Sequence, residues 1–353
     1  MNNKRSIFAS AVGIVTLALL VGVSTPAAAS PPVSSINLNC TKLAAATNPS
    51  ASFPTLISQR LSAAVEERTF DQIPDADIIK MVGGIDCDYS NGILAGQRDD
   101  SGAVGVNVQY LPYQAAGYRR WASSGLAPVT TPDDFFCFGI TTSECQLETS
   151  VGGDWLSVEV QGATSDAVAE DLSYRISAAL QLGQKTPYVP PLYATTLPHS
   201  CTTLIRPSVW RAAVGSPVPL VPFPAPPGWS PMNQAELVNR SVFCDMDDSM
   251  GSQSAGSIQT LPGGRWAFVQ LRSSLTSPGA LTAITVPGMR SGDTAFTRCA
   301  PRQARCVLDA LIATHWIEVD LWTSARGGTL ITTNRLAAMR PLLSEIVHQI
   351  YTP

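Results

Sequence analysis

Hydrophobic and polar side chains alternate most clearly near the end of the chain, over the stretch Trp316–Trp322. Because neighbouring side chains of a strand point to opposite faces, this alternation predicts a strand with one aliphatic face. We expect that face to pack against helices. The opposite face would then carry Trp316, Glu318, Asp320 and Trp322.

The same pattern occurs once more, earlier in the chain. Trp155–Val160 alternates like Trp316–Leu321, and the two tryptophans are 161 positions apart. The eight cysteines repeat in the same way, at offsets of 161, 157, 162 and 161. They are Cys40, Cys87, Cys137 and Cys145 in the first half and Cys201, Cys244, Cys299 and Cys306 in the second. Self-similarity at a long, nearly fixed offset predicts one structural unit present twice.

Each unit is predicted to open with a helix near a Cys-Thr-x-Leu sequence and to close on a second helix. In the second unit the opening helix is Pro207–Val214, with proline at its start and Gly215 just past its end. In the first unit it is Thr55–Glu67, where apolar residues recur at helical spacing. The closing helices are predicted at Asp166–Leu180 and Arg335–Ile350.

Strands are predicted between these helices. One strand carries the second cysteine of each unit, and the next follows at Val104–Tyr110 or at Trp266–Leu271. The third and fourth cysteines bracket a short loop before the tryptophan strand.

Prolines modify this pattern in three places. Pro341 is expected to kink the last helix or delay its start. Residues 183–198 hold several prolines and predict a semi-rigid link between the units. Pro217–Pro231 holds seven prolines, so a polyproline-like loop is expected there.

Together these elements predict an α+β fold of two tandem homologous domains. Each would be a small antiparallel sheet with helices on one face and two disulfides. The expected boundaries are residues 30–182 for the first repeat domain, 183–198 for the link and 199–353 for the second.

Residues 1–29 read as an export signal. Lys4 and Arg5 precede an uncharged run, Ile7–Val23, and small residues end at Ala29. A basic start, an apolar run and a small-residue site are typical of a secretory signal peptide, so cleavage is expected after Ala29. The alternative is an uncleaved N-terminal helix that tethers the protein to a membrane. The expected location is extracellular, with no membrane contact after cleavage.

The net charge of the chain argues against some classes of binding partner. The chain has 23 basic and 27 acidic residues, so loss of Lys4 and Arg5 leaves 21 against 27, a net charge of −6. No basic cluster remains to neutralise phosphates, which argues against nucleic acid and anionic lipid as partners. The partner that we expect is an unknown envelope protein, a glycan or a small ligand.

An even number of cysteines in an exported chain predicts structural disulfides. Three pairings are possible within each unit; we favour Cys40–Cys87, Cys137–Cys145, Cys201–Cys244 and Cys299–Cys306. A zinc site is not expected, because no Cys-x-x-Cys pair occurs and the three histidines, His199, His315 and His348, are scattered. We predict no metal and no cofactor.

The candidate binding site is the outer face of the second unit. With the two predicted strands side by side, it would carry aromatic residues beside two carboxylates: Trp266, Phe268, Trp316, Glu318, Asp320 and Trp322. An exposed aromatic patch is typical of an interface or ligand site. The alternative is that unit one or the proline-rich segment covers this face. Catalysis by Glu318 and Asp320 is not favoured, because a glycosidase needs carboxylates on opposite sides of a bond.

Other catalytic signatures are missing from the sequence. Asp245–Gly251 resembles a calcium loop but lacks glycine at the sixth place and glutamate at the twelfth. No Gly-x-Ser-x-Gly, His-Glu-x-x-His or phosphate-binding glycine loop occurs. No catalytic residue is therefore proposed.

Several short motifs carry a resemblance. They are the Cys-Thr-Thr-Leu opening at Cys201, the helix ending at Gly215, the Gly83-Gly84-x-x-Cys87 strand and the closing helix. They resemble uncharacterised secreted or lipoprotein domains of actinobacteria and are similar to the extracellular sensor domains of mycobacterial serine/threonine kinases. The chain departs from them in its duplication, in lacking a lipobox cysteine and in Asp88, where an aromatic residue is expected.

The resemblance implies an envelope location and a role in binding or sensing. The expected function is therefore that of a non-catalytic secreted binding protein whose site lies between the units or on the outer face of unit two. The alternatives are a secreted hydrolase, which needs His, Ser and a carboxylate together in one cleft, and a structural wall-associated protein.

Overall fold

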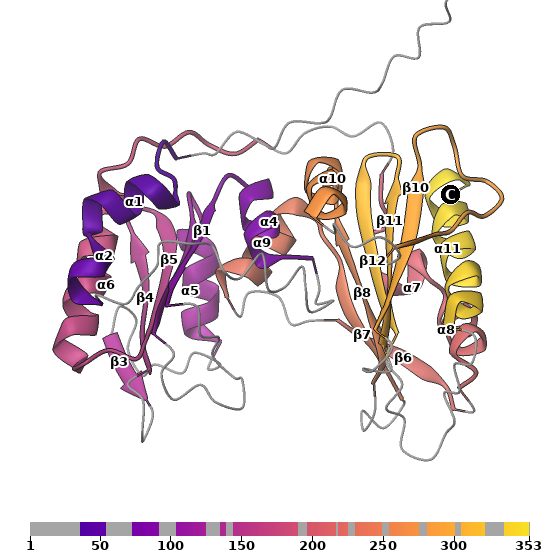
Figure 1. Ribbon diagram of the computed structural model, residues 1–353, viewed down its shortest axis with the longest axis horizontal. Coiled ribbons are helices and arrows are strands. Elements are labelled where there is room, and N and C mark those ends of the chain that lie inside the picture. The colour runs from indigo at the N-terminus through magenta and orange to yellow at the C-terminus, as the bar shows by residue number, and fades with distance from the viewer. Residues whose placement is uncertain are drawn as a thin grey trace, which may run out of the picture.

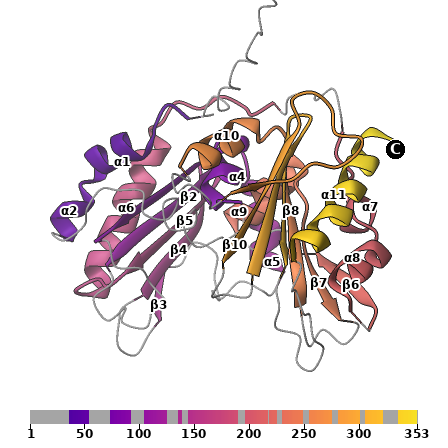
Figure 2. The ribbon, with the colours of Figure 1, turned by 45° about the vertical axis from the view of Figure 1, so that its right-hand side comes forward.

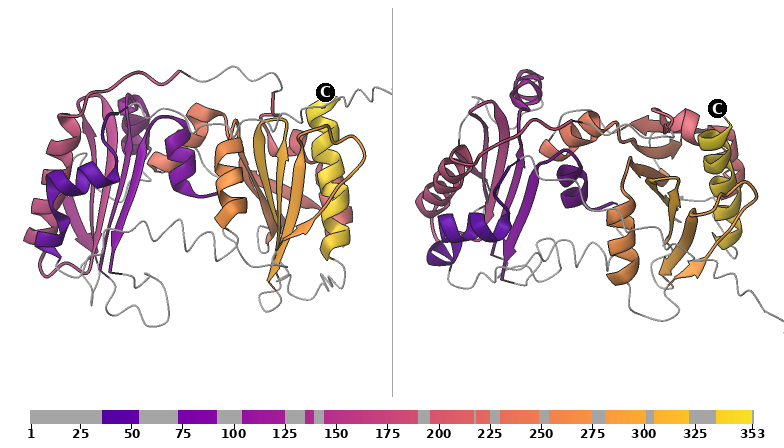
Figure 3. Two further views of the ribbon diagram at one scale, coloured as in Figure 1. Left: turned by 45° about the horizontal axis from the view of Figure 1, so that its top comes forward. Right: turned by 90° about the horizontal axis from the view of Figure 1, so that it is seen from above.

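Two antiparallel sheets face each other across a layer of helices in the computed structural model (Figure 1). Further helices cover the outer side of each sheet, so the molecule is built in five layers, an arrangement that Figures 2 and 3 show from other sides. The structure describes residues 36–53, 73–91, 104–124, 135–138, 144–189, 196–216, 218–224, 230–248, 254–274, 281–300, 305–321 and 335–352. The predicted export signal and the predicted helix Thr55–Glu67 lie outside the described residues.

The first repeat contains one five-stranded sheet in the order β1-β2-β5-β4-β3. Its elements are α1 (Cys40–Thr47), α2 (Pro49–Ser52), α4 (Asp75–Met81), β1 (Ile85–Ser90), β2 (Gly105–Leu111), α5 (Ala115–Ser123), β3 (Phe135–Phe138), β4 (Glu144–Val151), β5 (Asp154–Gln161) and α6 (Asp166–Gln181). The neighbouring strands pair antiparallel throughout.

The second repeat contains a seven-stranded sheet in the order β6-β7-β8-β12-β11-β10-β9. Its elements are α7 (Cys201–Leu204), α8 (Pro207–Val214), β6 (Leu220–Pro224), α9 (Pro231–Asn239), β7 (Phe243–Asp248), β8 (Ser254–Leu261), α10 (Arg265–Ser274), β9 (Thr282–Ala283), β10 (Thr294–Ala300), β11 (Arg305–Ile312), β12 (His315–Leu321) and α11 (Arg335–Tyr351). Between the edge strands β6 and β9, the order β7-β8-β12-β11-β10 repeats that of the first sheet. The α+β fold with one topology present twice is confirmed.

One predicted strand is wrong. Trp266–Leu271 lies within the helix α10, and the second strand of this repeat is β8. The offset of 161 that relates the two tryptophan strands does not hold in this region. The strands β2 and β8 instead match at an offset of 150, where Leu111-Pro112 corresponds to Leu261-Pro262.

The predicted effects of the prolines on secondary structure agree with the structure at some positions and differ at others. The helix α8 begins at Pro207, and Gly215 closes it in the left-handed conformation at φ 67°, as expected. The segment Pro217–Pro231 is not only loop, because part of it forms β6, an edge strand that tolerates prolines. The helix α11 starts at Arg335, so Pro341 lies inside it and does not delay its start.

The two long-range disulfides join α1 to β1 in the first repeat and α7 to β7 in the second. Cys40–Cys87 and Cys201–Cys244 close loops of 47 and 43 residues, and Cys137–Cys145 closes one of 8. These three pairings are confirmed. Cys306 is also disulfide-bonded. In the β10–β11 ladder its backbone pairs with that of Cys299. Multiple disulfides indicate an oxidising, extracytoplasmic environment.

The long-range bridges are expected to stabilise the fold more than the short one, because they restrict the unfolded chain more. Replacing both Cys201 and Cys244 by serine should lower the free energy of unfolding by about 4 kcal/mol, and the same change at Cys137 and Cys145 by about 2.5 kcal/mol. Urea unfolding of the two double variants under oxidising conditions measures the difference. Equal losses would contradict this order.

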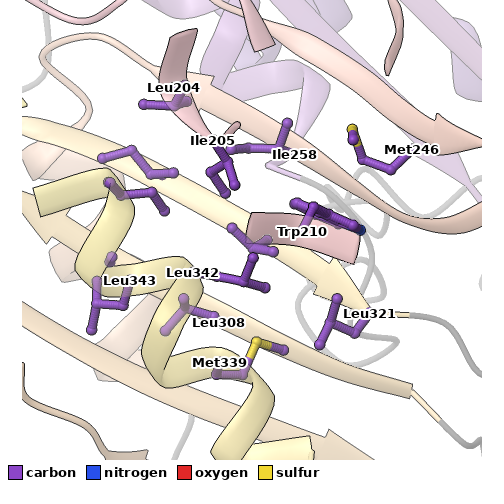
Figure 4. Packing of buried hydrophobic residues seen from close by; sticks show 14 of the residues in the cluster. Leu204, Ile205, Trp210, Met246, Ile258, Leu308, Leu321, Met339, Leu342 and Leu343 are labelled. Atoms are coloured by element: carbon purple, nitrogen blue, oxygen red, sulfur yellow. The ribbon is translucent and has the colours of Figure 1, made fainter. Parts of the chain in front are cut away.

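The outer core of each repeat lies between its sheet and its outer helices. In the second repeat, Trp210 is fully buried among leucines of α11 and the sheet (Figure 4). Ile317, Val319 and Leu321 belong to this core, so the predicted aliphatic face of the tryptophan strand is confirmed. In the first repeat, α1 and α6 pack against the sheet in the same way.

The sheets are covered on both faces, whereas the sequence predicted helices on one face only. A third core lies between the repeats and takes residues from α4, α5, α9, α10 and both sheets. The helices α4 and α9 occupy corresponding places in the two repeats and pack on each other, and α9 also contacts β2 and β5 of the first repeat. A Cβ atom on Gly117 of α5 would lie 2.6 Å from the side chain of Gln234 on α9, so the two helices approach closely here.

Candidate functional site

The residues predicted to form an exposed aromatic patch are buried between the two repeats. Trp316, Glu318 and Asp320 do share the inner face of β12, but they are only 0%, 2% and 1% exposed. Trp266 and Phe268 reach the same cluster from α10. Trp322 lies outside the described residues. The expectation of a bare surface is wrong, because unit one covers this face, as the alternative reading of the sequence proposed.

Each repeat places one tryptophan of this cluster against a buried carboxylate. The indole nitrogen of Trp155 donates to Glu148 at 2.7 Å, and that of Trp316 donates to Asp309 at 3.0 Å. An aromatic ring from the neighbouring helix meets each indole edge-on, Tyr118 in the first repeat and Phe268 in the second. The two repeats thus share an internal hydrogen-bonded arrangement as well as a topology.

The buried carboxylates have different neighbours in the two repeats. In the second repeat, Arg298 lies 2.8 Å from Asp309 and 3.5 Å from Glu318, all three buried. The longer distance is that of an ion pair rather than of a good hydrogen bond. Burial, more than the neighbouring Asp309, raises the pKa of Glu318 well above its ordinary value.

In the first repeat the corresponding positions hold Phe136 and Ser157 instead of Arg298 and Glu318. In the part of the chain that the structure describes, no lysine or arginine forms an ion pair with Glu148. Burial raises its pKa to about 7 despite hydrogen bonds from Ser157, Trp155 and Gln146. Because these groups are enclosed by protein, we interpret both arrangements as structural.

A cavity of about 480 Å³ opens beside the edge strand β6 of the second sheet. Its walls come from the start of α7, the edge strand β6, the helix α9 and the first residues of β7, and the Cys201–Cys244 bridge lies in the wall. Apolar surface is supplied by Pro222, Pro224, Leu237, Val242 and Phe243, and polar groups by His199, Ser200, Thr202, Asn233, Glu236 and Ser241.

Glu236 is the buried charged group of this cavity, at 6% exposure. Its carboxylate accepts hydrogen bonds from Asn233 at 3.3 Å and from Gln259 at 3.2 Å. The amide oxygen of Gln259 accepts from the backbone N–H of Ile73 in the first repeat, which fixes the direction of its amide group. Burial first, and then the charge of Asp75, raise the pKa of Glu236 to about 7.

Local structure explains how α9 presents this carboxylate. Ser230 caps the helix by accepting from the backbone N–H of Asn233, and Pro231 occupies its first turn. Asn233 and Glu236 are three residues apart, so their side chains lie on one helix face. Glu236 was not among the predicted site residues; the signal that could have been used is a carboxylate directly after an alanine in both helices, Ala76-Asp77 and Ala235-Glu236.

A second cavity, of about 590 Å³, lies beside the end of α8 and the start of β6. Its lining includes Pro207, Ser208, Arg211 and Leu220. It contains no buried carboxylate or histidine among its described lining residues, so the first cavity offers the richer chemistry.

Among the residues that the structure describes, one trio of possible metal-binding atoms lies close together: Cys137, Cys145 and Asp166. The two sulfurs are bonded to each other, so neither is a thiolate that could bind a metal. In the same part of the chain, no helix combines the length and the apolar character needed to cross a membrane.

Comparison with known proteins adds little to this description. No protein-family profile and no curated protein matches the chain. A crystal structure of the di-domain ARO/CYC StfQ from the steffimycin biosynthetic pathway is similar over 76% of this chain and 84% of that chain, at 10% identity and a TM-score of 0.18. A score this low carries no argument about fold or function.

Proposed function

We propose that the protein is an exported, non-catalytic binding protein of the bacterial envelope or medium, and that it holds a small ligand in the cavity beside the Cys201–Cys244 bridge. The cavity is the observation that carries this proposal. Its volume of about 480 Å³ lies within the usual range for small-molecule sites, roughly 300–1,000 Å³. Apolar walls with a few converging polar groups are typical of such sites.

Export is supported by the signal-like first 29 residues and by the disulfides. The resemblance to actinobacterial secreted domains and kinase sensor domains supports a role in binding or sensing. Among the classes of partner expected from the sequence, a small ligand or a single sugar unit matches a cavity of this size better than a protein or a long glycan.

The hydrolase alternative is favoured by one observation, the presence of His199, Ser200 and Glu236 around the same cavity. Their contacts do not form a relay. The Ser200 hydroxyl caps α7, where it accepts from the backbone N–H of Thr203 and shares hydrogen bonds with two threonine hydroxyls. In the described part of the chain, no hydrogen bond joins His199 to Ser200 or to Glu236. A nucleophile needs such a base within reach, so binding is the better supported function.

Filling the cavity tests the proposal. Thr202 is exposed on α7 and lines the cavity, and Thr41 is its exposed counterpart on α1 of the first repeat. In ligand-detected NMR with a library of small amphiphilic compounds, Thr202→Trp should weaken the binding of hits by about tenfold or more, equivalent to about 1.4 kcal/mol. Thr41→Trp should leave them unchanged. The proposal fails if no compound binds, or if hits bind equally well to both variants.

A further inference from the structure

The cavity in the second repeat has an unbalanced charge. Among its described lining residues none is lysine or arginine, and Glu236 is the carboxylate among them. His199 lies at an exposed position before α7. An anionic ligand would therefore meet no fixed positive charge, whereas a positively charged group would meet a carboxylate with low access to water.

The carboxylate of Glu236 also has capacity left for a ligand. An ionised carboxylate offers about four acceptor positions. Asn233 and Gln259 donate one hydrogen bond each, one to each oxygen. Both neighbours are neutral amides, so neither supplies the positive charge that would make a buried carboxylate stable in its ionised form.

The rest of the cavity suits the apolar part of such a ligand. Pro222, Leu237 and Phe243 line it, and Phe243 is half-buried, with an aromatic ring that can lie against a cation. From this charge and shape we propose that the cavity selects a small organic cation: an ammonium group that pairs with Glu236, carried on an apolar body that packs against these walls. This inference rests on the proposed function, because it names the ligand class of the same cavity.

Proton binding supplies a test that a purely apolar pocket would not pass. Since the pKa of Glu236 is raised to about 7, the free protein holds a proton there below pH 7. A cation must displace that proton, so its affinity should rise with pH and level off above 7. Among the described residues, Asp75 of α4 is the charged group that raises the pKa of Glu236, and burial raises the pKa of Asp75 itself to about 6; His199 also lines the cavity.

The experiment uses the full oxidised chain and three probes of one shape: 2-phenylethylamine, neutral 2-phenylethanol and anionic 3-phenylpropanoate. Titration calorimetry or NMR at pH 8 should show the amine binding at least about tenfold more tightly than the alcohol, and the anion most weakly. Between pH 8 and pH 6 the amine should weaken about tenfold, while the alcohol stays constant.

Single substitutions test whether Glu236 causes the preference for the amine and its pH dependence. Glu236→Gln keeps the shape and an acceptor oxygen but should remove both the amine preference and its pH dependence. Asp77→Asn makes the same kind of change at the corresponding buried position of α4 and should change neither. His199→Gln should retain the pH dependence, because the proton that the amine displaces is that of Glu236. Proton release by the unmodified protein, measured in two buffers of different ionisation enthalpy, checks the same point without any substitution.

Three results would overturn the inference: equal affinity for amine and alcohol, a pH-independent amine affinity, or unchanged behaviour of Glu236→Gln. If other compounds bind and Thr202→Trp displaces them, the cavity is still a binding site and only the choice of a cation is wrong. If neither these probes nor the library binds, the inference and the proposed function fail together.

Discussion

Replacement of Arg298 by methionine is expected to lower the free energy of unfolding by roughly 3–5 kcal/mol. The guanidinium is 2% exposed and lies 3.5 Å from Glu318 and 2.8 Å from Asp309. Burial disfavours its charge, and the two carboxylates offset that cost. Removing the cation leaves Asp309 in a protein interior with no opposite charge. The indole of Trp316 would still donate to it, but one hydrogen bond offsets only a small part of the loss.

Arg206 provides the matched control. It pairs with Glu345 at 2.6 Å, but its side chain is 59% exposed. Glu345 is only 6% exposed, but Arg206 itself is open to solvent, so Arg206→Met should lower stability less than Arg298→Met, which removes the cation of a fully buried cluster. Urea unfolding at pH 7, followed by circular dichroism, compares the two variants. Similar losses for both would show that burial of the Arg298 cluster adds nothing.

The first repeat suggests a compensated variant. At the positions that correspond to Arg298 and Glu318 it has Phe136 and Ser157. Combining Arg298→Phe with Glu318→Ser should therefore recover part of the stability that Arg298→Met loses. The contrast separates the cost of an unpaired carboxylate from any general intolerance of change at this position.

Much of the fold could be predicted because its signals are local or repeated. The alternation around Trp316 predicted which side chains share a face, and the cysteine spacing predicted the duplication and favoured, among three possible pairings in each unit, the disulfides that the structure has. Gly215 marked a helix end because a left-handed residue is needed there. Each of these depends on a few neighbouring residues or on a covalent bond.

The error at Trp266–Leu271 has a physical cause. Trp-Ala-Phe-Val-Gln-Leu satisfies the two-residue alternation of a strand, but it also fits a helix that buries Ala267, Phe268 and Leu271 and exposes Val269 at 40%. Short apolar runs are ambiguous between the two periods. The repeated Gln-x-Leu-Pro at Gln109 and Gln259 was the better guide, since it marks the end of the true strand in both repeats.

The burial of the predicted aromatic face and the position of the cavity could not be predicted from the sequence, for a different reason. Whether the inner face of a sheet is bare depends on how the two repeats pack, and no periodicity records that. The cavity is likewise assembled from four elements, with Glu236 oriented through Gln259 by the backbone of Ile73 in the other repeat. Of these elements, the sequence pattern predicted the strand that carries Cys244, but neither the edge strand β6 nor the helix α9.

Replacement of Glu148 by glutamine is expected to stabilise the protein increasingly as pH rises. Burial raises the pKa of Glu148 from its ordinary 4.5 to about 7, so the folded protein holds this proton more tightly than the unfolded chain does. The stability that this proton contributes is present below about pH 4.5 and is lost as pH rises through about 7. Glutamine cannot ionise, and its amide oxygen can still accept from Trp155.

The difference in unfolding free energy between Glu148→Gln and the unmodified protein should therefore grow by roughly 2–3 kcal/mol in favour of the variant between pH 5 and pH 8. Urea unfolding at several pH values measures it. Subtracting one protein from the other removes the contributions of Glu236, Asp75 and Glu318, whose pKa values are raised too. Glu170→Gln, on the exposed face of α6, should change stability by less than about 0.5 kcal/mol throughout. A pH-independent difference for Glu148→Gln would mean that Trp155 and the surrounding donors hold the buried carboxylate in its ionised form.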